Sequence, residues 1–431
     1  MSSKSDRKKK YMCIFQVAWW KWLLKKIIVI MVIVVFGAIG FLLAPRPYYK
    51  TGFRNLTELK QYVATKDEFI KMENKNLLMP SYENYYKKNF SYTFAHKIRE
   101  TCRFVLSKFG VMDKPLFSAS FFKTILEDVT KVRLRKGWTG EFVQKFQTTP
   151  ASKILVFGVV QGALHGLVRY LDKLKDLGII NEQLKVMNPD YFLVFLGNVV
   201  NRSPYTLEIF SIVLRLMQEN PDNVIYLKNS NEFPDYWRGQ TLRRELEIRA
   251  HHVSKQMIPL EKEVDTFFDT LPMNVYGTIP YVQYDKTPYF RLSSYTGDRE
   301  KSDEATFASF LLEKNRQRLD AFDLKKAAST PQKEYEKIEL RAVVKDIFKR
   351  EEYEEMDGLR LLDFQDNVAS WTVLSASSES YRAALNFFYD AFVVIDSAHE
   401  LRDWTITLYK RGIQELSKDF ETRFNYFFSG E

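Results

Sequence analysis

The chain has 431 residues, of which 45% are hydrophobic, and a formal net charge of +10. This apolar content suffices for a packed core and excludes a disordered or low-complexity protein. Eight basic residues and one acidic residue lie within positions 1–44, whereas the remaining residues hold 56 basic and 53 acidic groups. No basic stripe interleaved with aromatic residues follows this tail, so we expect no nucleic-acid partner.

Residues 27–44, IIVIMVIVVFGAIGFLLA, form an uncharged run that would span about 27 Å as a helix, close to the thickness of a bilayer core. We predict a single transmembrane helix here. A cleaved signal peptide is the alternative, but the run is followed only by a poor cleavage motif. Basic residues are more numerous before the run than after it, which predicts a cytoplasmic tail (1–26) and a periplasmic or lumenal C-terminal domain. Cys13 and Cys102 therefore flank the membrane, which excludes a disulfide framework.

The region 45–150 shows apolar residues at helical spacing in 93–109 and 118–135, and we predict a helical juxtamembrane collar. Apolar, β-branched runs at 153–160, 191–196 and 223–227 then predict three strands. Helical periodicity at 164–177 and 205–218 separates them. This alternation is typical of an α/β fold with a parallel sheet, whose chemistry lies in the loops after the strands.

The rest of the chain is less regular. We interpret the charged segment 297–339 as an insertion, and 370–375 and 391–396 as further strands. Residues 397–431 are predicted to close the chain as an amphipathic C-terminal helix.

The loops after the three predicted strands read GVVQG (158–162), GNVVNRS (197–203) and LKNSNE (227–232). Their spacing and surroundings resemble the serine/threonine phosphoprotein phosphatase branch of the calcineurin-like metallophosphoesterase superfamily. That branch carries Gly-Asp-x-His-Gly, Gly-Asp-x-Val-Asp-Arg-Gly and Leu-Arg-Gly-Asn-His-Glu at these places. The resemblance covers residues 151–396 and implies a metallophosphoesterase-like β-sandwich flanked by helices.

In that family, two divalent metals bind the phosphate and activate a bridging water. Carried over by position, the six metal-ligand positions fall on Val159, Gln161, Asn198, Ser230, Ser293 and Glu352. The two catalytic positions fall on Asn201 and Asn231. None of the six keeps its family residue, and Glu352, as the only charged ligand, cannot offset two dications in a buried pocket. The resemblance thus implies a pseudophosphatase without metal cofactors; an active enzyme would need two divalent metals of the Mn, Fe or Zn type.

Arg202 keeps the residue that grips phosphate in the family, which implies that a phosphorylated ligand could still bind. Alternatively, Arg202 caps the following helix or pairs with Glu208 or Glu232. We expect a membrane-anchored, catalytically inactive phosphatase-like protein that binds or scaffolds a protein or phosphoprotein partner. The rival hypothesis is a divergent, active metallophosphoesterase with a relocated site that uses Glu352, His165, or His251 with His252.

Overall fold

The computed structural model describes residues 20, 22–29, 31, 37, 53–70, 73, 81–89, 119–140, 142–249, 254–278, 289–294, 318–320, 337–342, 359–365, 368–373, 389–399, 404–412 and 420–427. The chain divides into two compact units. One comprises Met1–Tyr48 and Tyr92–Pro115, and the other Tyr49–Ser91 and Leu116–Glu431. Every element named below belongs to the second unit.

In the first unit, residues 22–29 are helical and expose large apolar side chains, among them Ile27, Ile28 and Val29. Within the described ranges, no helix combines the length and the apolar character that crossing a membrane requires. Most of the predicted span 27–44 lies outside those ranges. The transmembrane helix therefore stays a prediction.

The juxtamembrane region contains the helices α2 (Leu56–Val63), α3 (Glu83–Asn89) and α5 (Ala119–Arg135). The prediction of a helical region over 45–150 is wrong at its C-terminal end, because Phe142–Gln147 form a strand, β1. Five of the six β1 residues are buried, and β1 pairs with β5 on one edge and with β7 on the other. Gln144 and Lys145 are consecutive and both buried, so the sequence lacks the polar alternation that would reveal this strand.

The predicted parallel strands are present as β2 (Lys153–Phe157), β3 (Tyr191–Phe195) and β4 (Val224–Tyr226). The helices α6 (Leu164–Asp176) and α7 (Thr206–Glu219) connect them, which confirms the α/β layout. Phe157 pairs with Phe195, and Phe195 pairs with Tyr226. The three strands thus end at one edge of the sheet, and the loops that follow them meet there.

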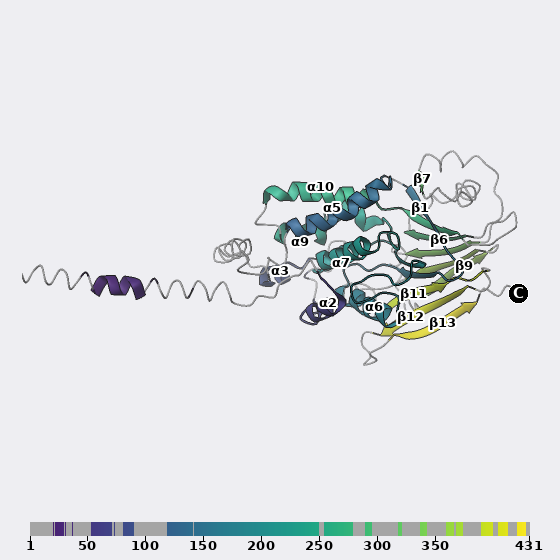
Figure 1. Ribbon diagram of the computed structural model, residues 1–431, viewed down its shortest axis with the longest axis horizontal. Helices are drawn as coiled ribbons and strands as arrows, with labels where there is room; N and C mark the ends of the chain where they lie inside the picture. The colour runs from purple at the N-terminus through teal and green to yellow at the C-terminus, as the bar shows by residue number, and fades with distance from the viewer. Residues whose placement is uncertain are drawn as a thin grey trace, which may run out of the picture. The chain divides into compact units, whose positions relative to one another are not determined.

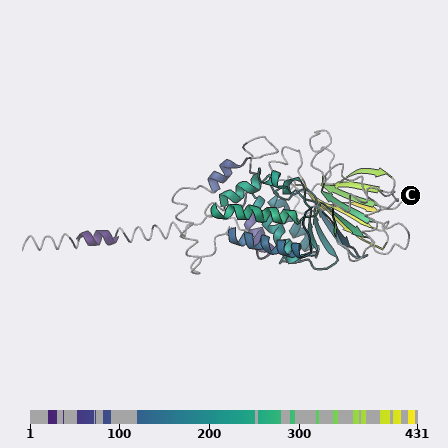
Figure 2. The ribbon, with the colours of Figure 1, turned by 90° about the horizontal axis from the view of Figure 1, so that it is seen from above.

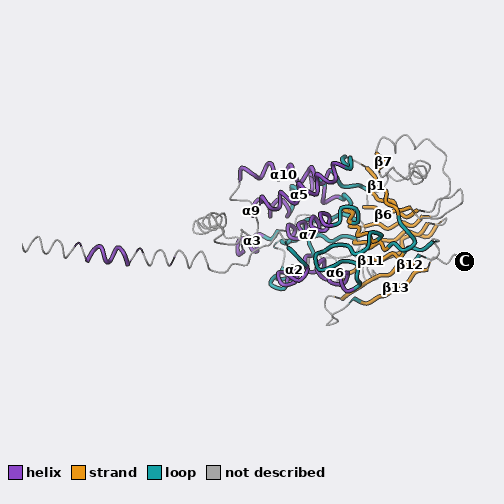
Figure 3. The backbone as a smooth tube through the Cα atoms, in the orientation of Figure 1, coloured by secondary structure: helices purple, strands orange, loops and turns teal. Residues whose placement is uncertain are grey.

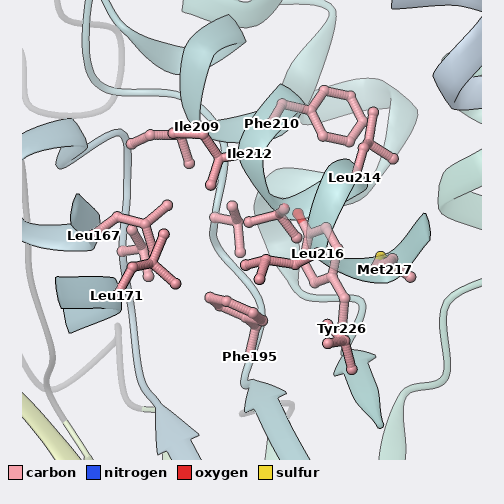
Figure 4. Packing of buried hydrophobic residues seen from close by; sticks show 14 of the residues in the cluster. Leu167, Leu171, Phe195, Ile209, Phe210, Ile212, Leu214, Leu216, Met217 and Tyr226 are labelled. Atoms are coloured by element: carbon pink, nitrogen blue, oxygen red, sulfur yellow. The ribbon is translucent and has the colours of Figure 1, made fainter. Parts of the chain in front are cut away.

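Side chains of β2 alternate between two hydrophobic clusters. Leu155 and Phe157 pack with the helices, whereas Ile154 and Val156 pack with residues of the other sheet. Burial of both faces explains the continuous apolar runs of these strands. Helices α5, α7, α9 (Thr241–Arg249) and α10 (Ser254–Asp269) gather on one side of the strands, as Figures 1, 2 and 3 show. Figure 4 shows part of the cluster between α6, α7 and the strands, with Leu167, Phe195 and Phe210 among its residues.

The second sheet has the strand order β7-β1-β5-β6-β8-β10-β9. Besides β1 it contains β5 (Asn274–Thr278), β6 (Tyr289–Ser294), β7 (Arg318–Asp320), β8 (Lys337–Ala342), β9 (Leu359–Gln365) and β10 (Val368–Val373). The rings of Phe146 in β1 and Phe192 in β3 lie 4.7 Å apart, so the two sheets pack face to face as a sandwich.

The prediction that 297–339 is an insertion is wrong for two stretches, which are strands of the second sheet. Residues 318–320 form β7, and β8 begins at Lys337 and pairs with both β6 and β10. Strand ladders are made by backbone groups, so a charged stretch can enter a sheet. The remainder of 297–339 lies outside the described residues.

The C-terminal helix predicted for 397–431 is also wrong. That region holds β12 (Thr405–Gly412) and β13 (Glu421–Phe427), which extend the first sheet from β11 (Tyr389–Asp396) in the order β13-β12-β11-β2-β3-β4. In β12, Ile406, Leu408 and Lys410 are buried and alternate with less buried residues, the period of a strand. The strands predicted at 370–375 and 391–396 correspond to β10 and β11.

Candidate functional site

Three loops meet at the carboxyl edge of β2, β3 and β4: the first loop (158–163), the second loop (197–205) and the third loop (227–232). The backbone N–H of Gln161 donates to the carbonyl of Asn198 at 2.9 Å. Gly162 has a φ of +76°, and a Cβ at this position would lie 2.1 Å from the Cβ of Ser203. The first loop can therefore approach the second only with glycine at position 162.

Non-glycine residues with left-handed backbone gather in these loops. Gln161, Asn198, Asn201 and Arg202 have φ values of 42°, 51°, 73° and 61°. This conformation costs an ordinary residue about 1–2 kcal/mol, and it persists only where the surroundings hold it. The hydrogen bonds of the loops supply that restraint.

Glu232 is the centre of this restraint, and it is fully buried. Its carboxylate accepts hydrogen bonds from the backbone N–H groups of Asn198, Val199 and Asn229, each at 3.0 Å, and from the hydroxyl of Tyr226 at 2.7 Å. Burial raises the pKa of Glu232 to about 7, although these donors act in the opposite direction. The sequence showed Glu232 only as a possible partner of Arg202, whereas it joins the second and third loops.

Two of the family's metal-ligand positions are in direct contact. The side-chain oxygen of Asn198 accepts from the hydroxyl of Ser230 and from the backbone N–H of Asn231, both at 3.1 Å. In the first loop, Val159 is buried in the cluster between the sheets, and Gln161 is 1% exposed. The structure thus brings Val159, Gln161, Asn198 and Ser230 to one edge of the sheet.

The other two ligand positions are less fully described. Ser293 lies in β6, paired with Asn274 of β5 and with Arg341 of β8. Glu352 lies outside the described residues, as do His251 and His252. Within the described ranges, no three His, Cys, Asp or Glu side chains form a group that could hold a metal.

Buried carboxamide atoms in the first two loops lack partners. The Oε1 atom of Gln161 and the Nδ2 atom of Asn198 have no hydrogen-bond partner among the described residues. An amide nitrogen carries hydrogens and cannot ligate a cation, and the oxygen of Asn198 already accepts two hydrogen bonds. The described ligand positions therefore offer a cation only neutral groups.

The two catalytic positions of the family also lie side by side. Nδ2 of Asn201 donates to the carbonyl of Asn231 at 3.3 Å, and Nδ2 of Asn231 donates to the carbonyl of Val200 at 3.2 Å. The oxygen of Asn201 accepts from the backbone N–H of Leu242 in α9 at 3.1 Å. Neither carboxamide ionises near neutral pH, so this pair fixes the backbone and supplies no acid or base.

Arg202 is 5% exposed, and its carbonyl accepts a hydrogen bond from the hydroxyl of Tyr82 at 2.9 Å. Capping of α7 by Arg202 is wrong, because the carboxylate of Glu245 accepts from the N–H groups of Thr206 and Leu207 at 3.0 Å. A carboxylate suits the positive end of a helix, whereas a guanidinium does not. No pattern in the sequence indicates this role of Glu245, which lies 39 positions from Thr206.

The proposed acidic partners of Arg202 have other hydrogen bonds. Glu232 accepts the four described above, and Glu208 accepts from the hydroxyl of Tyr62 at 3.1 Å. Both carboxylates are fully buried. Glu232 joins the second and third loops, and Glu208 links α7 to α2.

His165 lies in the first turn of α6, where its Nε2 atom is 3.1 Å from the carbonyl of Lys66. Burial lowers the pKa of His165 and outweighs the opposing effects of the Glu68 charge and the Lys66 carbonyl. Its ring lies 6.0 Å from that of Tyr205. These contacts fasten the juxtamembrane region to α6.

No protein-family model matches the chain, and no curated protein sequence matches it. Solved structures similar to it include a protein serine/threonine phosphatase from Saccharomyces cerevisiae with similarity to human phosphatase PP5. The identity is 11%, the coverage is 75% of this chain and 98% of that one, and the TM-score is 0.44. A cold-active protein-tyrosine phosphatase of a Shewanella species has 10% identity, coverage of 63% and 82%, and a TM-score of 0.34. Vps29 of Chaetomium thermophilum has 13% identity, coverage of 64% and 95%, and a TM-score of 0.26. At these TM-scores the likenesses carry no argument about this chain.

Proposed function

We propose that this chain is a membrane-anchored, catalytically inactive phosphatase-like protein that acts as a binding or scaffolding module. Its partner would be a protein or phosphoprotein, with the phosphate recognised by Arg202. The tail 1–26 would be cytoplasmic and the large domain periplasmic or lumenal, as the charges around residues 27–44 suggest.

The observation that carries this proposal is the hydrogen bonding of Asn198. The family bridges two metals with a carboxylate at this position, whereas the Asn198 oxygen accepts from Ser230 and Asn231. Loops that hydrogen bonds hold in place, with only neutral groups at the described ligand positions, support a module that keeps its shape and lacks metal-dependent hydrolysis. No cofactor is part of this proposal.

Metal analysis and a p-nitrophenyl phosphate assay test the inactivity on the full chain purified in detergent with manganese. We expect neither stoichiometric manganese nor turnover. The matched control restores the family ligands through the six substitutions Val159→Asp, Gln161→His, Asn198→Asp, Ser230→Asn, Ser293→His and Glu352→His. Manganese bound by this variant alone would show that the pocket is shaped for metal and that only its ligands are missing. Turnover by the unaltered chain that Glu352→Ala abolishes would refute the proposal and favour the active phosphoesterase.

Binding is tested with a phosphoserine peptide and its unphosphorylated counterpart on the same full chain. We expect the phosphorylated peptide to bind more tightly. The Arg202→Lys variant keeps the charge but loses the two-point geometry of guanidinium, and should weaken that preference about tenfold. Equal affinity for the two peptides would remove phosphate recognition from the proposal.

A further inference from the structure

The second loop contains two consecutive left-handed residues, Asn201 and Arg202, with φ values of 73° and 61°. Neither is glycine, so this turn needs restraint from its surroundings. Helix α9 holds Asn201 through the N–H of Leu242. The restraint on Arg202 comes from a segment far away in the sequence.

That segment comprises residues 81–89 of the juxtamembrane region. The hydroxyl of Tyr82 donates to the carbonyl of Arg202 at 2.9 Å, although the two residues are 120 positions apart. Tyr82 is 1% exposed and clusters with Tyr86 and with Ile248 of α9. Its hydroxyl is thus held in a packed environment, where a hydrogen bond fixes geometry well.

Two neighbours of Tyr82 in the 81–89 segment contact the elements on either side of the Asn201–Arg202 turn. The carboxylate of Glu83 accepts from Arg244 of α9 at 2.7 and 3.0 Å, and α9 is the helix that holds Asn201. The ring of Tyr85 lies 6.1 Å from that of Tyr205, just after the turn. Residues 82, 83 and 85 therefore contact the Asn201–Arg202 turn or the elements that flank it.

We propose that Tyr82 is a positioning residue for Arg202, and that the 81–89 segment makes phosphate binding depend on the juxtamembrane region. Guanidinium binds phosphate through a planar two-point geometry, so its affinity depends on a fixed backbone. Phosphate recognition itself rests on the proposed function, whereas the restraint of the turn does not.

Amide hydrogen exchange tests the restraint in the full chain in detergent. Tyr82→Phe removes the hydroxyl that donates a hydrogen bond to the carbonyl of Arg202 in the turn. Tyr170→Phe is the matched control, because the Tyr170 hydroxyl is equally buried and also bonds a backbone group, the N–H of Ala391 at 3.1 Å. We expect exchange in residues 198–206 to rise about 5- to 30-fold in Tyr82→Phe only, with β2 and β3 unchanged. Equal exchange at residues 198–206 in all three proteins would overturn the proposal.

The second measurement is the affinity of the same three proteins for inorganic phosphate. We expect Tyr82→Phe to bind about fivefold more weakly than the unaltered chain and Tyr170→Phe to bind equally well. If the unaltered chain binds no phosphate, phosphate recognition fails, while the exchange data still judge the restraint. Faster exchange with unchanged phosphate affinity would overturn the positioning role of Tyr82.

Discussion

The hydroxyl of Ser230 donates a hydrogen bond to the side-chain oxygen of Asn198, 3.1 Å away, and so joins the third loop to the second. In the resembled family both positions ligate metal. Here they bond to each other, and the fully buried Asn198 also accepts from the N–H of Asn231. The neutral amide matters for stability, because a carboxylate at this place would be a buried charge without a cation.

Asn198→Asp should therefore lower the free energy of unfolding by about 2 kcal/mol at pH 7.5, and by less at pH 5, where the new carboxyl can bind a proton. Urea unfolding at the two pH values measures both effects. Asn181→Asp is the control, because the Asn181 oxygen also accepts two hydrogen bonds, both from backbone N–H groups, but at an exposed site. Equal losses in the two variants would contradict the role assigned to burial.

Gly162→Ala should destabilise the protein by about 3 kcal/mol, since the new Cβ meets Ser203 in addition to the cost of positive φ. Gly178 provides a matched control, because its φ is +69° and a Cβ added there would meet no atom within 4 Å. Gly178→Ala should cost only about 1 kcal/mol. Chemical unfolding of both variants measures the difference, which is expected to shrink when Ser203→Gly accompanies Gly162→Ala.

Glu232 should make stability depend on pH. Its pKa of about 7 lies above the ordinary 4.5, so the folded state holds the proton more tightly than the unfolded state. The unfolding free energy should therefore fall as pH rises from 4.5 to 7, by about 3 kcal/mol if this group acts alone. Urea unfolding of the unaltered chain and Glu232→Gln across this window measures the contribution.

In Glu232→Gln this slope should disappear. The variant should also be less stable at every pH in the window, because an NH2 group would replace one carboxylate oxygen and turn its hydrogens towards the backbone N–H group of either Asn198 or Val199. A variant with the same slope as the unaltered chain would assign the pH dependence to other groups.

His165 should act with the opposite sign. Burial lowers its pKa below 6.5, so the unfolded state binds the proton more readily and stability falls as pH drops through about 6.5. Glu68 and Arg169 face this histidine, and Arg169 also pairs with Asp390. His165→Gln should reduce the loss between pH 7.5 and 5.5.

Urea unfolding at the two pH values measures this loss. His399→Gln, at an exposed histidine, is the control and should behave as the unaltered chain does. A His165→Gln variant that loses as much stability as the control would contradict the prediction.

The sequence alone determined the strands β2, β3 and β4, the loops that follow them, and the neutral character of Val159, Gln161, Asn198 and Ser230. These are local properties. A short β-branched run between helical periods has few alternatives, and the chemistry of a side chain does not depend on its fold.

Only the tertiary structure determined that Glu232 joins the second and third loops, that Glu245 caps α7, and that the Tyr82 hydroxyl donates a hydrogen bond to the carbonyl of Arg202. Each of these contacts joins segments 33 to 120 positions apart, and sequence spacing carries no information about such contacts. The C-terminal strands were missed for the same reason: β12 pairs with the edge of β11, and β13 pairs with β12. The local sequence pattern thus predicts where the loops lie, whereas contacts between distant segments determine which residues hold the loops in place.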